Sequence, residues 1–194
     1  MQNDVSSQKL LVAFVGMPGS GKSEATKYLR EKGFASVRFG EVAEEGLKEM
    51  GLPLTPDNEQ MYREKIRNEL GMAAFAILSE EKIESFLKDN PVVVIDGLYS
   101  WEEYRYLLEK FLALKIIYVF ASPATRYSRL AKRPVRPLTP EQARARDFAE
   151  IERLNKSGPI AMADFVIENN TSLDDLYTKI DELLKHLQIT RSSP

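Results

Sequence analysis

The residues with the clearest chemical potential lie near the amino terminus, in the stretch Gly16-Met17-Pro18-Gly19-Ser20-Gly21-Lys22-Ser23. Its glycines allow the backbone to wrap closely around an anion, with successive N–H groups pointing inward. At this spacing, Lys22 is expected to reach the β- and γ-phosphates of a nucleotide, and the Ser23 hydroxyl is expected to hold Mg²⁺. The glycines could instead form only a tight turn, but a purely structural turn has no use for this Lys-Ser pair.

The segments on either side of this stretch predict the setting that a phosphate-binding loop requires. Residues 10–15 form a short apolar run with β-branched members, which is typical of a buried parallel strand. Residues 22–31 predict a helix, whose N-terminus adds a partial positive charge. A strand, a glycine-rich turn and a helix in this order predict a P-loop. The residues expected to bind the nucleotide here are Gly16, Pro18, Gly19, Ser20, Gly21, Lys22, Ser23 and Glu24.

A carboxylate follows a second apolar run, residues 91–97, which predicts a strand ending near Asp96. In a P-loop fold an acid at such a strand end lies near the Mg²⁺ and the transferred phosphoryl group. We therefore expect Asp96 to contact the metal or to orient the attacking oxygen. The alternative is an acid that only caps the following turn. Beyond it, Tyr99 could stack on a base, although aromatic residues near strand ends are more often packing residues.

Positive charge is concentrated in residues 123–146, where seven basic residues accompany a single acid. Three prolines within residues 134–140 break the helical pattern, so this segment predicts a short arginine-bearing loop between helices. Arginine suits a lid over phosphates, because its planar fork meets phosphate oxygens in pairs and keeps its charge. We expect such a lid over about residues 126–146, and the alternative is a solvated basic face on a mobile loop. The arginines expected to stabilise the transferred charge are Arg129, Arg133 and Arg136.

The composition of the 194 residues is that of an ordinary globular protein, with 43% hydrophobic residues, 29% charged residues and a net charge of −2. No apolar run approaches the roughly 18 residues that cross a membrane. Residues 1–8 lack the basic region of a signal peptide, so we expect a cytoplasmic protein without a membrane partner. The absence of cysteine and the single histidine, His186, argue against thiolate, serine-triad and His-ligated zinc chemistry. Because the excess of positive charge is concentrated in residues 123–146, a compact polyanion is favoured over a nucleic acid partner.

Apolar runs and helical periodicity alternate along the chain, which predicts a single domain with a three-layer α/β/α fold, parallel strands and right-handed crossovers. The expected strands are residues 10–15, 35–39, 91–97, 115–121 and 163–167. The expected helices are residues 22–31, 40–50, about 57–90, 101–112, about 123–133, 141–156 and 173–187. Asp57 or Asn58 is expected to cap the third helix, Gly71 to break it, and Gly158 to lie in a helical interruption. Residues 40–90 are then a helical insertion that could cover a substrate.

Several short strings point to a known superfamily. They are Val15-Gly16-Met17-Pro18-Gly19-Ser20-Gly21-Lys22-Ser23, Phe39-Gly40-Glu41-Val42, Gly51-Leu52-Pro53-Leu54-Thr55-Pro56-Asp57-Asn58, Ile95-Asp96-Gly97-Leu98-Tyr99-Ser100, Arg146-Asp147 with Glu150-Ile151, and Ala163-Asp164-Phe165-Val166-Ile167-Glu168-Asn169-Asn170. Through them the chain resembles the P-loop nucleoside monophosphate kinase superfamily over residues 10–187. Within it, the chain is similar to dephospho-coenzyme A kinases and to an adenylate-kinase-like group first recognised in archaea.

This resemblance implies a five-stranded P-loop NTPase sheet of order 2-3-1-4-5, with ATP and Mg²⁺ on the P-loop. It also implies an acceptor under the helical insertion and lid arginines that close over the phosphates. The loop after the last strand, which contains Asn169, is implied to lie beside the adenine, and Arg129 is also expected to contact the cofactor.

The chain departs from the superfamily at two positions on the acceptor side. Glu41 stands where these kinases commonly have aspartate, and no arginine follows it. Tyr99 stands where the adenylate-kinase-like group usually has arginine. Arg63 and Arg67 on the helical insertion are then the candidates for binding an acceptor phosphate. The full set of residues expected to bind the acceptor is Phe39, Gly40, Glu41, Arg63, Arg67, Gly97 and Tyr99.

We therefore expect an ATP-dependent kinase that transfers the γ-phosphoryl group of Mg-ATP to a small nucleotide-like acceptor. The acceptor could be a nucleoside monophosphate or dephospho-coenzyme A. Transfer to a sugar hydroxyl requires a base, for which Asp96 is available, whereas transfer to a phosphate oxygen requires positive charge around the acceptor. The alternative is a nucleotide-binding regulatory ATPase or sensor without kinase activity. The sequence carries no signal for the oligomeric state.

Overall fold

The computed structural model describes residues 9–189, and the expectation made for residues 1–8 lies outside this range. The strands are β1 Leu10–Val15, β2 Ala35–Arg38, β3 Val92–Asp96, β4 Leu114–Phe120 and β5 Phe165–Glu168. The helices are α1 Lys22–Glu31, α2 Gly40–Glu49, α3 Pro56–Leu70, α4 Ala74–Asp89, α5 Trp101–Lys110, α6 Pro123–Ala131, α7 Pro140–Leu154, α8 Ser157–Ala161 and α9 Leu173–His186. Within residues 9–189, no helix combines the length and the apolar character that crossing a bilayer requires.

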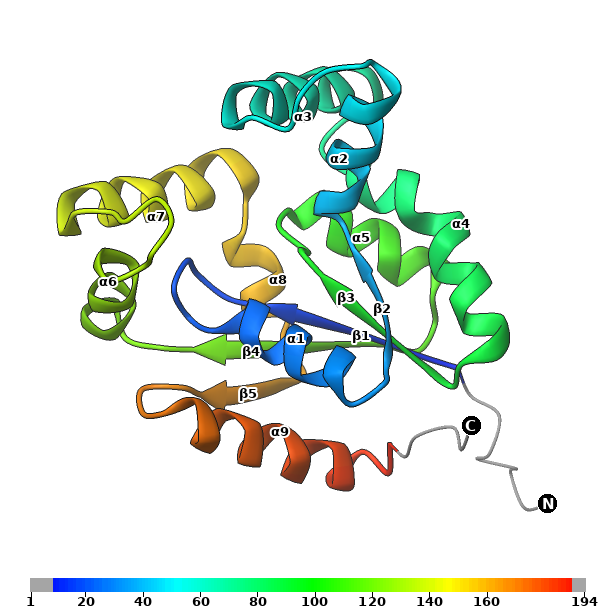
Figure 1. The fold of residues 1–194 in the computed structure, drawn as a ribbon. Helices are drawn as coiled ribbons and strands as arrows, with labels where there is room; N and C mark the ends of the chain where they lie inside the picture. The colour runs from blue at the N-terminus through cyan, green and yellow to red at the C-terminus, as the bar shows by residue number, and fades with distance from the viewer. Residues whose placement is uncertain (1–8, 190–194) are drawn as a thin grey trace.

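The five strands form one parallel sheet of order β2-β3-β1-β4-β5, which confirms the predicted topology (Figure 1). In the centre of the sheet, Ala13 pairs with Ile95 on one side and with Ile116 on the other. Because all strands run in the same direction, their carboxyl ends meet at one edge, where loops that carry functional residues gather. The glycine-rich stretch after β1 lies at this edge.

Helices cover both faces of the sheet, which confirms the three-layer architecture. Alternate residues of β1 point to opposite faces, so Ala13 packs in one apolar cluster and Phe14 in the other. The cluster around Ala13 includes Ile83 of α4 and Leu107 of α5. The cluster around Phe14 includes residues of α1 and α9, such as Leu29. Figure 1 shows α2 and α3 on one side of the strand ends, and α6 and α7 on the other.

Two local predictions were wrong, and both errors have a physical reason. Thr55, and not Asp57 or Asn58, caps α3: its hydroxyl accepts a hydrogen bond from the Asn58 backbone N–H at 3.3 Å, and a proline follows it at the first helical position. The helix α7 ends at Leu154, because the next residue, Asn155, has a left-handed backbone (φ 50°). Gly158 then lies inside the short helix α8, where an interruption was expected. The predicted break near Gly71 is present, because α3 ends there and α4 starts at Ala74.

Candidate active site

The loop between β1 and α1 has the backbone conformation of an anion-binding cradle. Gly19 (φ 80°) and Gly21 (φ 102°) are in the left-handed region, which favours glycine. A Cβ atom on Gly19 would lie 2.8 Å from the Arg126 carbonyl oxygen, so a side chain has no room there. The Ser20 hydroxyl is buried and has no hydrogen-bond partner among the residues described. The cradle therefore fits a phosphate group, which would supply the missing partner.

Lys22 lies in the first turn of α1, with its Nζ 5.8 Å from the centroid of the Tyr99 ring. Burial, followed by the positive charge of Lys156, lowers the pKa of Lys22 to about 7, and the charges of Glu150 and Asp96 oppose this shift. An ammonium that is desolvated in this way gains strongly from an anionic ligand. The position of Lys22 is thus suited to a phosphate bound in the cradle.

Asp96 ends β3 next to this loop, at the edge of the sheet where the strand carboxyl ends meet. Burial raises the pKa of Asp96, while a hydrogen bond with Thr26 and the charges of Lys22 and Arg38 oppose the shift. Ser23, the other residue expected to hold a metal, is exposed in the first turn of α1. Hydroxyl and carboxylate oxygens are the hard ligands that Mg²⁺ prefers, so the chemistry of these two side chains fits that ion.

The loop after β5 packs against the cradle through Asn169. The Asn169 side chain is buried, and its Nδ2 donates a hydrogen bond to the Ser20 carbonyl oxygen at 2.8 Å. Arg129 of α6 holds the same loop, because its guanidinium donates to the Asn169 carbonyl oxygen at 2.9 Å and to the Thr171 carbonyl oxygen at 3.1 Å. Arg129 therefore positions the loop after β5.

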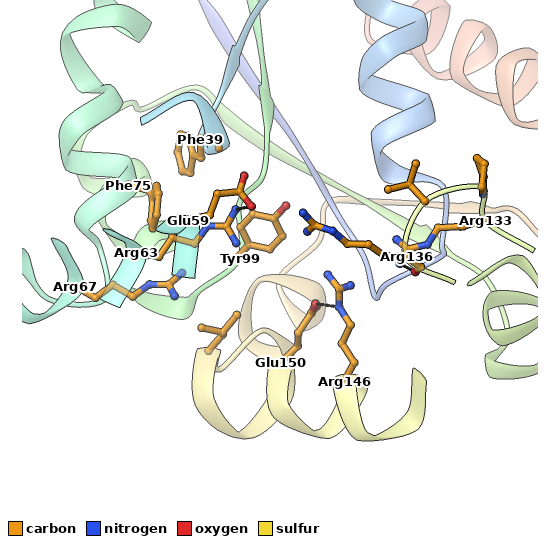
Figure 2. Close-up of a pocket in the computed structure, with 14 residues that line it drawn as sticks. Phe39, Glu59, Arg63, Arg67, Phe75, Tyr99, Arg133, Arg136, Arg146 and Glu150 are labelled. Carbon is orange, nitrogen blue, oxygen red and sulfur yellow. Dashed lines mark hydrogen bonds and ion pairs between the residues drawn. The ribbon is translucent and has the colours of Figure 1, made fainter. Parts of the chain in front are cut away.

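A cavity of about 660 Å³ lies beyond the carboxyl ends of β2 and β3. One wall comes from α3 and α4 and carries Glu59, Arg63, Arg67 and Phe75. The opposite wall comes from the α6–α7 loop (residues 132–139) and from α7, and it carries residues 133–136, Arg146, Glu150 and Leu154. Tyr99 lies between the two walls, and Phe39 lies on the side of Phe75 (Figure 2). Gly40 also lines the cavity.

Five arginines line this cavity against two carboxylates. Arg63 lies 3.6 Å from Glu59, and Arg146 donates from Nε to Glu150 at 3.2 Å, so each carboxylate already has an arginine partner. Within residues 9–189, no carboxylate forms an ion pair with the three other arginines of the cavity, which are Arg67, Arg133 and Arg136. The cavity consequently carries an excess of positive charge, which favours an anionic ligand.

Arg67 shows most clearly that a partner is missing. Its guanidinium packs 5.2 Å from the centroid of the Phe75 ring, and its Nε is buried without a hydrogen-bond partner among the described residues. Burial lowers the pKa of Arg67, and the nearby Glu103 opposes that shift. A buried donor without a partner is costly, so an oxygen-bearing anion in the cavity would stabilise this side chain.

Of the residues expected at the acceptor site, Phe39, Gly40, Arg63, Arg67 and Tyr99 are brought together in the cavity, along with two of the expected lid arginines. Three expected residues do not line it. The Glu41 carboxylate forms an ion pair with Lys82 at 2.7 Å. Gly97 is buried, and a Cβ atom on it would lie 3.1 Å from the Tyr99 ring. The Arg129 guanidinium donates to the Asn169 carbonyl oxygen in the loop after β5.

Arg126, at the start of the expected lid, is likewise absent from the cavity. It is buried and forms a two-pronged ion pair with Asp147 of α7, at 2.8 and 2.6 Å. Its Nη1 also donates to the Pro18 carbonyl oxygen at 3.1 Å. Arg126 therefore joins the cradle to α6 and α7.

Several residues in or beside the cavity have no individual role predicted from the sequence. Glu59 and Phe75 are two of these, and the spacing of four residues from Glu59 to Arg63 was the only signal for the first. Arg146 and Glu150 have the same spacing and occurred in the strings that carried the resemblance. Lys156, which is buried behind Glu150, had no signal in the sequence.

The parallel sheet of order β2-β3-β1-β4-β5 with a P-loop after β1 defines the class of this protein: it has a P-loop kinase-like fold. Residues 12–155 match the family described as an AAA domain. The chain is 36% identical over 182 residues to a UPF0200 protein of Thermococcus kodakarensis, with 92% of this chain and 98% of that protein covered. It is 34% identical over 180 residues to a UPF0200 protein of Methanocaldococcus jannaschii, with 92% and 90% covered. The chain belongs to the UPF0200 family.

Solved structures with the same fold include kinases of small molecules. The structure of TT1252 from Thermus thermophilus superposes with a TM-score of 0.60 at 20% identity, over 93% of this chain and 98% of that chain. Shikimate kinase from Bacteroides thetaiotaomicron superposes with a TM-score of 0.58 at 15% identity, over 93% and 99%. At these identities the similarity shows the fold alone. A reaction must therefore be inferred from the residues of the site.

Proposed function

We propose that this chain is an ATP-dependent kinase that transfers the γ-phosphoryl group of Mg-ATP to a small nucleotide-like acceptor bound in the arginine-lined cavity. One observation carries the proposal: the P-loop lysine, Lys22, and the cavity meet at the same side chain, Tyr99. A phosphate-binding loop that only hydrolyses or senses a nucleotide needs no second anion-binding cavity beside it.

On the donor side, the backbone N–H groups of residues 16–23 would bind the phosphates, and Lys22 would neutralise their charge. Ser23 and Asp96 are the side chains that would hold Mg²⁺. When bound, Mg-ATP supplies the phosphoryl group and part of the charge neutralisation at its oxygens. Arg129 and Asn169, which fix the loop after β5, would shape the position of the adenine.

On the acceptor side, the partly exposed ring of Tyr99 is the candidate for stacking on a base. Phe39 and Phe75 are buried and supply the apolar wall of the cavity. Arg67 and Arg63 supply guanidinium groups for a phosphate. Because nucleoside monophosphates and dephospho-coenzyme A both combine a base with phosphate, both suit this combination. The cavity volume of about 660 Å³ is within the range of ordinary small-molecule sites.

The α6–α7 loop would act as the lid, and α2–α4 as the helical cover on the acceptor. Arg133 and Arg136 approach the cavity from the side opposite to Arg67 (Figure 2). Groups on two sides can hold an acceptor in line with the donor phosphates and exclude water, which accounts for most of the catalysis in phosphoryl transfer.

The test is ATP consumption by the wild-type chain with and without AMP, CMP, UMP, dTMP and dephospho-coenzyme A. We expect strong dependence on one acceptor, and a loss of at least about a hundredfold in Lys22→Ala, because one preorganised charge contact is removed. Lys27→Ala, an exposed change on the same helix, is the matched control and should retain activity. Hydrolysis that is independent of every acceptor would instead support a regulatory ATPase, and binding of ATP without turnover would support a sensor.

A further inference from the structure

Lys156 is a completely buried lysine to which the proposed reaction gives no role. It lies between α7, which ends at Leu154, and α8, which starts at Ser157. A buried ammonium is costly unless a hydrogen-bonded opposite charge accompanies it. That charge is the carboxylate of Glu150, whose Oε2 accepts a hydrogen bond from Lys156 Nζ. Burial lowers the pKa of Lys156, and the charge and the hydrogen bond of Glu150 oppose this shift. The pair with Glu150 therefore favours the charged form of Lys156 behind the cavity.

Glu150 connects Lys156 to the cavity. Its carboxylate lines the cavity, and its Oε1 accepts a hydrogen bond from Arg146 Nε at 3.2 Å (Figure 2). Burial would raise the pKa of Glu150, but the charge and the hydrogen bond of Lys156 lower it below its usual value, so the carboxylate is ionised. Lys156 Nζ also lies 4.8 Å from the centroid of the Tyr99 ring, which borders the same cavity.

An ionised carboxylate in the wall of a cavity for anions would repel its ligand. Inside a protein, a like charge a few ångströms away weakens binding by roughly tenfold or more. We infer that Lys156 is a positioning residue: it neutralises Glu150 from the protein interior, so that Arg146 presents its positive charge to an anionic acceptor. This inference rests on the proposed function, because it takes the acceptor in the cavity to be anionic.

The simpler role for Lys156 would be to hold α8 against α7. A purely structural role predicts that loss of Lys156 lowers the stability of the fold without a specific effect on anions. The electrostatic role predicts that the effect on anion binding disappears when Glu150 is made neutral as well. The two roles are therefore separated by a double substitution.

The variants are Lys156→Met and the double variant Glu150→Gln/Lys156→Met, with Lys115→Met as the matched control. Lys115 forms its ion pair with Asp164 at an exposed site on β4, at 2.9 Å. The probe is inorganic phosphate, titrated by calorimetry into protein that is saturated with Mg²⁺ and a non-hydrolysable ATP analogue. The analogue occupies the P-loop, so the heat of phosphate binding reports on the cavity. Circular dichroism checks the folding of each variant.

We expect wild type and Lys115→Met to bind phosphate alike, Lys156→Met to bind about tenfold more weakly, and the double variant to return to within about threefold of wild type. The inference is overturned if Lys156→Met binds as tightly as wild type, or if the double variant is as weak as Lys156→Met. If Lys156→Met does not fold, a folded double variant that binds more than about tenfold more weakly than wild type overturns it.

Failure of the proposed function gives a different result. If the wild-type chain does not bind the ATP analogue, the donor half of that proposal fails, and the variants are then compared with phosphate alone. If wild type binds the analogue but no phosphate, the cavity is not an anion site. In that case the inference on Lys156 is wrong, whereas nucleotide binding at the P-loop is supported.

Discussion

Replacement of Glu103 by glutamine should change how the stability of this protein depends on pH. Glu103 is completely buried at the start of α5, and its Oε2 accepts hydrogen bonds from the backbone N–H groups of Tyr99 at 2.7 Å and Ser100 at 3.0 Å. Its Oε1 has no partner among the described residues. Burial raises the pKa of Glu103 to about 7, although these two backbone donors, Arg67 and Lys156 all favour the ionised form.

The size and the sign of the effect follow from this raised pKa. The folded chain binds the Glu103 proton more tightly than the unfolded chain, in which the pKa is near 4.5. The contribution of this proton to stability is therefore complete below pH 4.5 and is lost as the pH rises through about 7. Each unit of pKa corresponds to about 1.4 kcal/mol, so the loss is about 3 kcal/mol. Glutamine does not ionise, and its side-chain oxygen can still accept from both backbone donors.

The measurement is urea unfolding of wild type and Glu103→Gln at several pH values from 4.5 to 8.5. We expect the free energy of unfolding of the variant, relative to wild type, to increase by about 3 kcal/mol across this range. The glutamine N–H₂ group takes the position of Glu103 Oε1, where it has no partner within residues 9–189, and this costs stability at every pH. That cost shifts the whole curve of unfolding free energy against pH and leaves its slope unchanged. Glu109→Gln, an exposed change on the same helix, controls for a general effect of charge. If the difference in unfolding free energy between Glu103→Gln and wild type does not change with pH, the predicted role of the Glu103 proton is wrong.

Three further predictions concern the cavity, the cradle and its support. Arg67→Ala should raise the KM for the acceptor about 10- to 100-fold in steady-state assays. Arg63→Ala should raise it less, because Arg63 already pairs with Glu59. Equal increases in KM would contradict the prediction that Arg67 contributes more than Arg63 to acceptor binding. Gly19→Ala should abolish binding of an ATP analogue in calorimetry, because a Cβ would lie 2.8 Å from the Arg126 carbonyl oxygen. Gly33→Ala is the control and should keep full affinity, because Gly33 has a similar positive φ and open space around it. Retained binding by Gly19→Ala would show that the cradle tolerates a side chain. Asp147→Asn should lower the free energy of unfolding by about 3–5 kcal/mol in urea, because it leaves a buried guanidinium without its opposite charge; a loss below about 1 kcal/mol would contradict that ion pair.

Local patterns were sufficient to predict the sheet and the cradle. The run before Gly16 is buried on both faces, and its apolar, β-branched content follows directly from that burial. Helix ends were less predictable, because several residues compete for each one: Thr55 with its following proline displaced Asp57 as the cap of α3. Gly158 suggested a break, but it lies within α8, where it packs so closely against the Trp101 ring that a Cβ atom would lie 2.6 Å from it.

The partners of side chains across the cavity could not be predicted. Arg129 and Arg133 lie four residues apart on the chain, yet the first holds the loop after β5 and the second lines the cavity. Which of two such arginines reaches a ligand depends on carbonyl groups that are distant in sequence, such as that of Asn169. The same holds for Lys156, since its burial becomes evident only when α7, α8 and Tyr99 are seen together.

The contacts of Arg126 join the donor loop to one wall of the cavity. One guanidinium joins the Pro18 carbonyl oxygen of the donor loop to Asp147, which lies one residue from Arg146 on α7. The donor loop and the α7 wall of the cavity are thus linked through one buried side chain. Under the proposed function, closure over the acceptor would then fall to residues 132–139, which lie between α6 and α7 and carry Arg133 and Arg136 into the cavity.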